Sequence, residues 1–273
     1  PVFVDSEQKT WNIDPEKIEQ AITPRTKAII VVHIYGHPAD MKAVMEIAHR
    51  HNLYVIEDAA EAHGARIDDK PVGAFGDVST FSFFGNKIIT TGEGGMVVTN
   101  NADLAQKIRQ LKGQGVDPDR RYWFPIVGYN YRMTNIQAAI GLAQLEKVDW
   151  HLAQRRRIAK TYHKFLEDVE GVALQPELPG YVNSYWMVSL LLDEKLPQRD
   201  WVMLQLAECG IETRPFFYPM HVLPMYKDLS QGRDFPIADR VSAQGMNLPS
   251  SASLTEDDVS YICDNLTGIV FGR

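Results

Sequence analysis

A single lysine, Lys87, stands apart from the other charged residues of the chain. An aromatic, strand-like run at 79–84 precedes it, and a glycine-rich turn at 92–95 leads into a second extended run at 96–99. Burial lowers the pKa of an ammonium group, and a neutral amine can attack a carbonyl to form a Schiff base. The alternative is a lysine that extends from a strand end into solvent. The segment by itself leaves both interpretations open.

Two further side chains favour the chemical interpretation. Ser82 lies five residues before Lys87, where its hydroxyl could hold a phosphate group. Asp58 follows the apolar run 53–57, which reads as a buried strand. Parallel strands present ligand-binding groups at their carboxyl ends, so Asp58 is placed to hold a protonated pyridine nitrogen. A Schiff-base lysine together with such an acid is what pyridoxal 5'-phosphate requires of its protein.

Several separated motifs resemble those of one protein family. They are EDAAEAHG at 57–64, FFGNK at 83–87, RYWFPIVGYNYRMTN at 121–135 and RPFFYPMHVLPMY at 214–226. With them the whole chain resembles the sugar aminotransferases of the DegT/DnrJ/EryC1/StrS family, a branch of the aspartate-aminotransferase fold. The resemblance implies an α/β large domain with a mostly parallel mixed sheet and a smaller C-terminal α+β domain. It also implies pyridoxal phosphate as cofactor, glutamate as amino donor and a nucleotide-linked 4-keto-6-deoxysugar as substrate, with GDP-4-keto-6-deoxymannose expected.

The resemblance also assigns roles to individual residues. Lys87 would bind the cofactor and move the proton, and Asp58 would keep the pyridine ring protonated. Glu61 stands where most of the family has a glutamine that contacts the cofactor's phenolic oxygen, so this contact needs a protonated carboxyl or another partner. The remaining expected cofactor contacts are Ala60 against the ring, and Ser82 and Asn130 at the phosphate, with Asn130 reaching the neighbouring subunit's site in a homodimer. The candidates for binding substrate are Arg214, Tyr218, His221 and Tyr226.

Three alternative functions differ in chemistry. A deoxysugar dehydratase would use the same cofactor without net amino transfer, but the family's known example has histidine in place of the lysine. A regulator that binds pyridoxal phosphate without catalysis is a second alternative. A Rossmann oxidoreductase is disfavoured because no G-x-G-x-x-G motif follows the first strands.

Composition limits the class of protein further. The chain has 273 residues, of which 45% are hydrophobic, and a net charge of −7, which argues against a nucleic-acid-binding surface. Cys209 and Cys263 predict a reducing, cytoplasmic environment without disulfides. No apolar run approaches the roughly 20 residues that span a membrane. The histidines show no recognisable zinc spacing, so no metal is expected.

The pattern of elements predicts the architecture. We expect helices at 14–22 and 40–51, capped by Asp14 and Asp40, around an apolar strand at 27–33 that is covered on both faces. A hairpin is expected at 66–72, one long helix at 135–166 and a closing helix at 254–266. The expected domains are 1–170, which binds the cofactor and reads as incomplete at its N-terminus, and 171–273.

Overall fold

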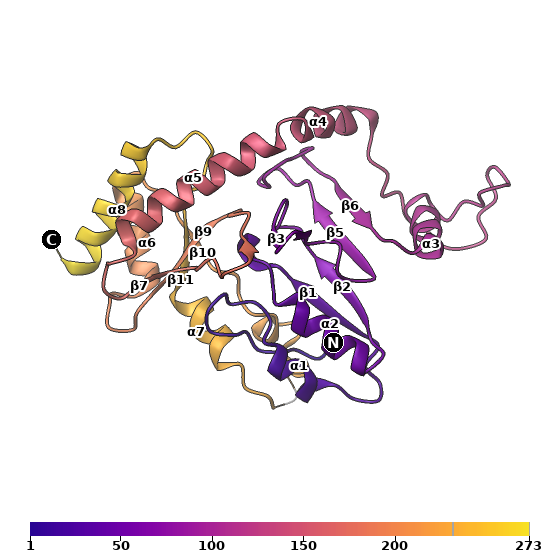
Figure 1. The fold of residues 1–273 in the computed structure, drawn as a ribbon, viewed down its shortest axis with the longest axis horizontal. Coiled ribbons are helices and arrows are strands. Elements are labelled where there is room, and N and C mark those ends of the chain that lie inside the picture. The colour runs from indigo at the N-terminus through magenta and orange to yellow at the C-terminus, as the bar shows by residue number, and fades with distance from the viewer. Residues whose placement is uncertain (231, 273) are drawn as a thin grey trace.

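The computed structural model describes residues 1–230 and 232–272, and a four-stranded sheet organises its first half (Figure 1). The strand order is β1-β2-β5-β6, with the first three strands parallel and β6 antiparallel to β5. This confirms the predicted mixed, mostly parallel sheet. The strands are β1 (Ala28–Val32), β2 (Tyr54–Asp58), β5 (Val78–Ser82) and β6 (Gly95–Val98).

Helices α1 (Pro15–Ala21) and α2 (Met41–Arg50) cover one face of this sheet. Asp14 and Asp40 cap them as predicted, since each aspartate side chain accepts a hydrogen bond from a backbone N–H of the first turn. A short η1 (Ile34–Gly36) follows β1. The core beneath these helices consists of aliphatic side chains from both layers, among them Ile18, Val31, Val44, Ile47 and Val55.

The opposite face of the same sheet differs from the prediction. The side chains of Ile30 and Tyr54 are 62% and 65% exposed, and Met96 on β6 is 51% exposed. The expectation that the 27–33 strand is covered on both faces is therefore wrong for the described residues. Alternate side chains of β1 are buried and open, because the described helices pack on one face only.

Between the second and third strands of the sheet, the chain forms the predicted hairpin. Its strands β3 (Arg66–Ile67) and β4 (Lys70–Pro71) join β8 (Tyr181–Val182) in a small antiparallel sheet. After β6 comes α3 (Ala102–Lys112), capped by Asn101. The predicted long helix at 135–166 is instead two helices, α4 (Asn135–Leu145) and α5 (Val148–Leu166), because Glu146 and Lys147 interrupt the helical run. Figure 1 shows α5 leading from α4 to the second half of the molecule.

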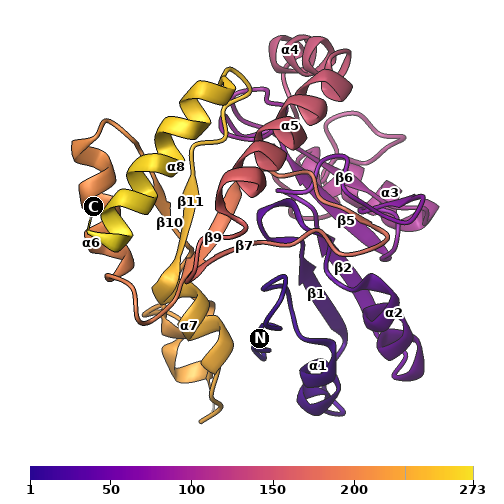
Figure 2. The same ribbon diagram turned by 60° about the vertical axis from the view of Figure 1, so that its left-hand side comes forward.

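The second half surrounds an antiparallel sheet of order β10-β11-β9-β7. Its strands are β7 (Val172–Leu174), β9 (Val188–Leu192), β10 (Arg214–Pro215) and β11 (Gly245–Leu248), and its helices are α6 (Arg199–Glu208), α7 (Pro236–Gln244) and α8 (Glu256–Phe271), with η2 (Met220–Val222) and η3 (Lys227–Leu229) between them. Helices α5 and α8 pack together beside this sheet (Figure 2). The closing helix is longer than predicted.

The core of the second sheet draws on residues from both sides of the predicted domain division. Ile158, Tyr162 and Leu166 of α5 are fully buried in it, beside Leu190 and Leu266. The division at residues 170 and 171 stays a prediction. Among the described residues, every helix is too short or too polar to serve as a membrane span.

Candidate active site

Lys87 follows β5, in the connection to β6 at the carboxyl end of the parallel strands. Its Nζ lies 3.7 Å from Glu61 Oε1 and 3.8 Å from the centroid of the Trp186 ring, and its side chain is 11% exposed. Burial lowers the pKa of Lys87, although attraction to Glu61 and Asp58 opposes this shift. The lysine therefore has a larger neutral fraction than a solvated lysine, which a nucleophilic amine requires.

Glu61 is fixed between this lysine and the backbone. Its Oε2 accepts a hydrogen bond from the N–H of Tyr35 at 2.8 Å. Burial raises the pKa of Glu61 to about 7. This effect of burial is larger than the opposing effects of the hydrogen bond from Tyr35 and the attraction of Lys87, which both lower the pKa. The carboxyl can therefore carry a proton near neutral pH. A glutamate in place of the family's glutamine must be protonated to donate a hydrogen bond, and Glu61 meets this condition near neutral pH.

Tyr35 lies beside Glu61 and contacts it through its backbone N–H. It adopts a left-handed backbone conformation (φ 56°), which is unusual for a bulky residue and directs its N–H toward the Glu61 carboxylate. Its hydroxyl accepts a hydrogen bond from the N–H of Phe217 at 3.0 Å, and its ring stacks with Trp186. The strained turn is thereby held by contacts from the second half of the chain.

Asp58 ends β2 at the same edge of the sheet. Its Oδ1 accepts a hydrogen bond from the N–H of Ala60 at 3.1 Å, which orients the carboxylate over the following turn. Asp58 is close enough to Lys87 to influence the pKa of the lysine. Ala60 is half-buried and small, and it leaves room beside the aspartate. The structure therefore brings Asp58, Ala60, Glu61 and Lys87 together.

His63 lies beside this group in an aromatic setting. Its ring is 5% exposed and packs 5.5 Å from the ring of Phe81 and 5.9 Å from that of Phe83. Neither ring nitrogen has a hydrogen-bond partner among the described residues. Burial and the charge of Lys87 lower the pKa of His63 to about 4, so the ring is neutral at pH 7.

Glu57, for which no role was predicted from the sequence, lies in β2 and holds the loop that leads into β5. Its buried carboxylate accepts hydrogen bonds from the N–H groups of Gly73, Phe75 and Gly76, which fixes the loop leading into β5. Burial alone would raise the pKa of Glu57, but hydrogen bonds from His33 and from this loop lower it to about 2. Nδ1 of His33 accepts from the N–H of Ala39, so its Nε2 carries the proton donated to Glu57.

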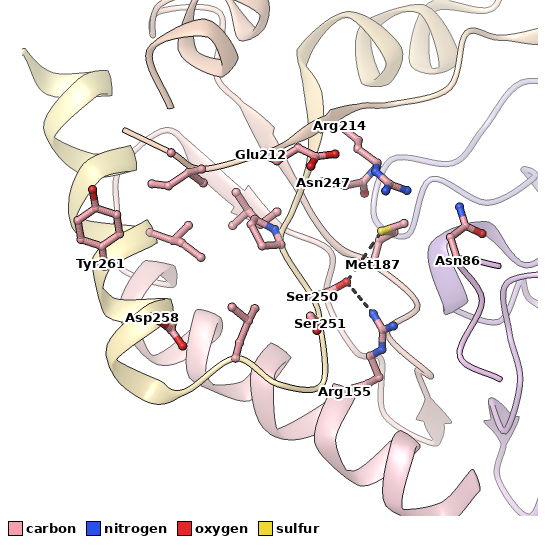
Figure 3. A pocket seen from close by; sticks show the side chains of 16 residues that line it. Asn86, Arg155, Met187, Glu212, Arg214, Asn247, Ser250, Ser251, Asp258 and Tyr261 are labelled. Atoms are coloured by element: carbon pink, nitrogen blue, oxygen red, sulfur yellow. Dashed lines mark hydrogen bonds between the residues drawn. The ribbon is translucent and has the colours of Figure 1, made fainter. Parts of the chain in front are cut away.

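The structure places three other predicted site residues on separate elements. Ser82 ends β5, and its Oγ accepts from the N–H of Phe84. Asn130 is exposed in the loop before α4, where its Oδ1 accepts from Arg132. Arg214 lines a cavity that also reaches Asn86, next to Lys87 (Figure 3).

The remaining substrate candidates are engaged elsewhere or open to solvent. Tyr218 is 71% exposed. His221 pairs with Asp239 at 2.9 Å, and Tyr226 packs edge-on against Phe3. No described contact joins any of these three to Lys87, so their substrate role stays a prediction. The described residues contain no group of three or more His, Cys, Asp or Glu side chains able to hold a metal ion.

Comparison with known proteins identifies the family. The profile of the DegT/DnrJ/EryC1/StrS aminotransferase family matches residues 1–267. The chain belongs to this family. The family is dependent on pyridoxal phosphate, which agrees with the cofactor predicted from Lys87 and Asp58.

The chain is also similar to individual proteins of known sequence or structure. The chain is 54% identical to the GDP-perosamine synthase of Caulobacter vibrioides, over 96% of this chain and 71% of that protein. It is 50% identical to the GDP-perosamine synthase of Escherichia coli O157:H7, over 97% of this chain and 72% of that protein. The structure of Helicobacter pylori PseC, an aminotransferase involved in the biosynthesis of pseudoaminic acid, superposes with a TM-score of 0.94 at 28% identity, covering 100% of this chain and 74% of PseC. These similarities confirm the predicted aspartate-aminotransferase-like fold.

The residues present fit pyridoxal phosphate. An amine with a lowered pKa, a carboxylate at a strand end and a buried carboxyl that can be protonated converge at one edge of the sheet. Trp186 and Tyr35, which enclose this group, could not be recognised from sequence. Trp186 is separated from Lys87 by about a hundred residues, and no local pattern signals its approach.

Proposed function

We propose that this chain transfers an amino group from glutamate to a nucleotide-linked 4-keto-6-deoxysugar, GDP-4-keto-6-deoxymannose. The observation that carries the proposal is the largely buried Lys87, held between Glu61 and Trp186 near Asp58, where burial lowers its pKa. The similarity to two GDP-perosamine synthases at 50% identity or more supports the nucleotide and the sugar.

Bound pyridoxal phosphate would supply the carbonyl that captures amines and the ring that accepts electrons. Lys87 would hold the cofactor through Nζ and then carry a proton to and from the substrate carbon. Asp58 would keep the ring nitrogen protonated, and Ser82 would contact the phosphate. Glu61, protonated near neutral pH, would donate a hydrogen bond to the cofactor's phenolic oxygen, as a glutamine would.

A product assay tests this function. The protein, with pyridoxal phosphate and glutamate, is incubated with GDP-4-keto-6-deoxymannose, and the nucleotide sugars are analysed by mass spectrometry. We expect a 4-amino sugar and an equal amount of 2-oxoglutarate. Lys107→Ala, which alters an exposed lysine of α3, serves as the control for Lys87→Ala. A dehydrated sugar without transfer of nitrogen would instead support the deoxysugar dehydratase, and cofactor binding without any product would support the regulatory alternative.

We further propose that two copies of the chain form a homodimer in which Asn130 contacts the phosphate in the partner's site. The helix after Asn130 leaves apolar side chains open, with Ile136 76% exposed and Leu142 60% exposed. Tyr129 and Tyr131 beside Asn130 are also more than half exposed. Such a patch favours association, and twofold symmetry would create two equivalent shared sites.

Subunit mixing tests the shared site. Lys87→Ala and Asn130→Asp chains, each inactive or crippled alone, would form mixed dimers in which one site combines an intact Lys87 with an intact Asn130. Activity should return to about half of the normal value per mixed dimer. If subunit exchange is confirmed and activity stays absent, Asn130 does not act across an interface.

A further inference from the structure

A cavity of about 510 Å³ opens beside Asn86, the residue that precedes Lys87 in the chain (Figure 3). Its size is within the range of small-molecule sites. The walls come from α5, β11, α8 and the segment before β10, and Asn86 closes one end. Much of the lining is apolar, contributed by Ile211, Leu248, Pro249, Leu254 and Ile262.

Arg155 of α5 brings a positive charge to this cavity. Its Nη1 donates hydrogen bonds to the carbonyl oxygen of Trp186 at 3.0 Å and to Ser250 Oγ at 2.8 Å, and both acceptors are neutral. Burial lowers the pKa of Arg155, and no carboxylate is paired with it among the described residues. A guanidinium removed from water without a counterion is costly, so the site favours an anion.

Arg214 of β10 projects toward the same cavity, as Figure 3 shows. None of the ion pairs in the described part of the chain involves it. Two acidic residues also line the cavity, but Asp258 accepts hydrogen bonds from Thr255 at the start of α8, and Glu212, like Arg214, is exposed to solvent. Asn247 and Ser250, both buried, complete the polar lining.

We propose that this cavity binds the carboxylate of a small organic acid between Arg155 and Arg214. The planar guanidinium matches a carboxylate with two parallel hydrogen bonds. The first turn of α8 carries Glu256, Asp257 and Asp258, which disfavours a doubly charged phosphate at this end of the cavity. The apolar remainder of the lining suits the carbon chain of the acid.

Trp186 connects this site to the lysine. Its carbonyl oxygen accepts from Arg155, its indole N–H donates to the carbonyl oxygen of Asn86 at 2.8 Å, and its ring faces Lys87 Nζ. An acid bound at Arg155 would therefore contact the residues that position the lysine. The choice of acid rests on the proposed function, whose amino donor and 2-oxo acid product both belong to this class.

Calorimetric titration of the Lys87→Ala protein tests the cavity, because that variant cannot turn over substrate, and 2-oxoglutarate, which has no amine to react with the cofactor, reports binding without any reaction. The probes are glutamate, 2-oxoglutarate and inorganic phosphate. We expect at least one of the two organic acids to bind more tightly than phosphate. Adding Arg214→Gln should weaken that binding about tenfold or more, the effect expected for loss of a charge-assisted hydrogen bond. Arg240→Gln, at an exposed arginine of α7 outside the cavity, should leave it unchanged.

Arg155→Lys is the second variant, since it keeps the charge and removes the planar fork. It should also weaken binding of the acid, and circular dichroism checks that it folds. If it does not fold, the Arg214→Gln result decides. Absence of binding by both acids, equal weakening by Arg240→Gln, or tighter binding of phosphate would overturn the proposal. None of these results depends on whether the protein transfers amino groups.

Discussion

The two main sheets of this molecule bury their residues in different ways. All five residues of β9 and all four of β11 are buried in the second sheet. In the first sheet, β1 alternates between buried and open side chains, and β6 has no buried residue. The two central strands of the second sheet lie in a closed core, although its edge strand β10 is exposed, whereas the first sheet presents an open apolar face and a polar carboxyl edge.

The two sheets therefore have different roles: the first positions the reactive groups, and the second stabilises the fold. The titratable groups with the strongest electrostatic coupling to Lys87 come from the carboxyl edge of the first sheet, where Asp58 ends β2 and Glu61 and His63 follow it. The second half of the chain contributes enclosing side chains, Trp186 and Phe217, and none of its described ionisable groups contacts the lysine amine. Changes at the edge of the first sheet should therefore affect activity, and changes in the second sheet should affect folding.

The largest expected effect is at Lys87. Lys87→Ala should abolish amino transfer while leaving the unfolding midpoint close to that of the unaltered chain, because the alanine removes one partly buried charge. Turnover measured with glutamate and the keto sugar, alongside thermal unfolding, checks both parts. Residual turnover above a few per cent would show that another amine performs the reaction.

Asp58→Asn is expected to lower kcat by about a hundredfold or more, a typical loss when an electrostatic partner of the reacting group is removed. The isosteric amide cannot keep a pyridine nitrogen protonated. Steady-state kinetics checks this, with Asp69→Asn, in the exposed hairpin turn, as the control. Near-normal kcat in Asp58→Asn would assign the ring nitrogen to another group.

A pair of core variants compares the two sheets directly. Leu190→Ala in β9 should lower the free energy of unfolding by about 2–5 kcal/mol, because a fully buried side chain leaves a cavity. Ile30→Ala in β1 should cost about 0.5 kcal/mol or less, as expected for an exposed position. Urea unfolding measures both. A cost at Ile30 as large as that at Leu190 would mean that the open face is covered in solution.

The smallest effect is a shift in pH dependence. Ionised Glu61 attracts the Lys87 ammonium and so opposes the lowering of its pKa. Glu61→Gln removes this attraction, and the pKa of Lys87 should fall further. The rate of Lys87 acetylation, followed by peptide mass spectrometry as the pH is raised from neutral, should therefore begin to rise at a lower pH in Glu61→Gln than in the unaltered chain. Glu46→Gln, in α2, should match the unaltered chain. An unchanged profile in Glu61→Gln would show that Glu61 does not influence the pKa of Lys87.

Local signals in the sequence predicted much of the fold. Asp14 and Asp40 cap the helices they were expected to cap, because capping depends on a few neighbouring residues. The interruption at Glu146 and Lys147 was missed, since neither residue is a helix breaker. The sequence also did not show that helices cover only one face of β1, because an apolar strand does not reveal which described helices pack against it.

The candidate site likewise contains some residues that the sequence could single out and others that only the structure reveals. Lys87 and Asp58 stand in motifs with their own local character, so the sequence could single them out. Trp186 and Arg155 act through contacts with residues far away in the chain, and nothing in their neighbourhoods distinguishes them from core or surface side chains. The raised pKa of Glu61 likewise comes from burial, which only the packed structure supplies.

Borohydride reduction of the protein with pyridoxal phosphate, followed by peptide mapping, tests the central claim most directly. Reduction fixes the cofactor to the amine that holds it, and the modified peptide identifies that amine. We predict that the label is found on Lys87 alone and is lost in Lys87→Ala. Label on another lysine of the unaltered chain, or on none, would contradict the assignment of Lys87 as the residue that binds the cofactor.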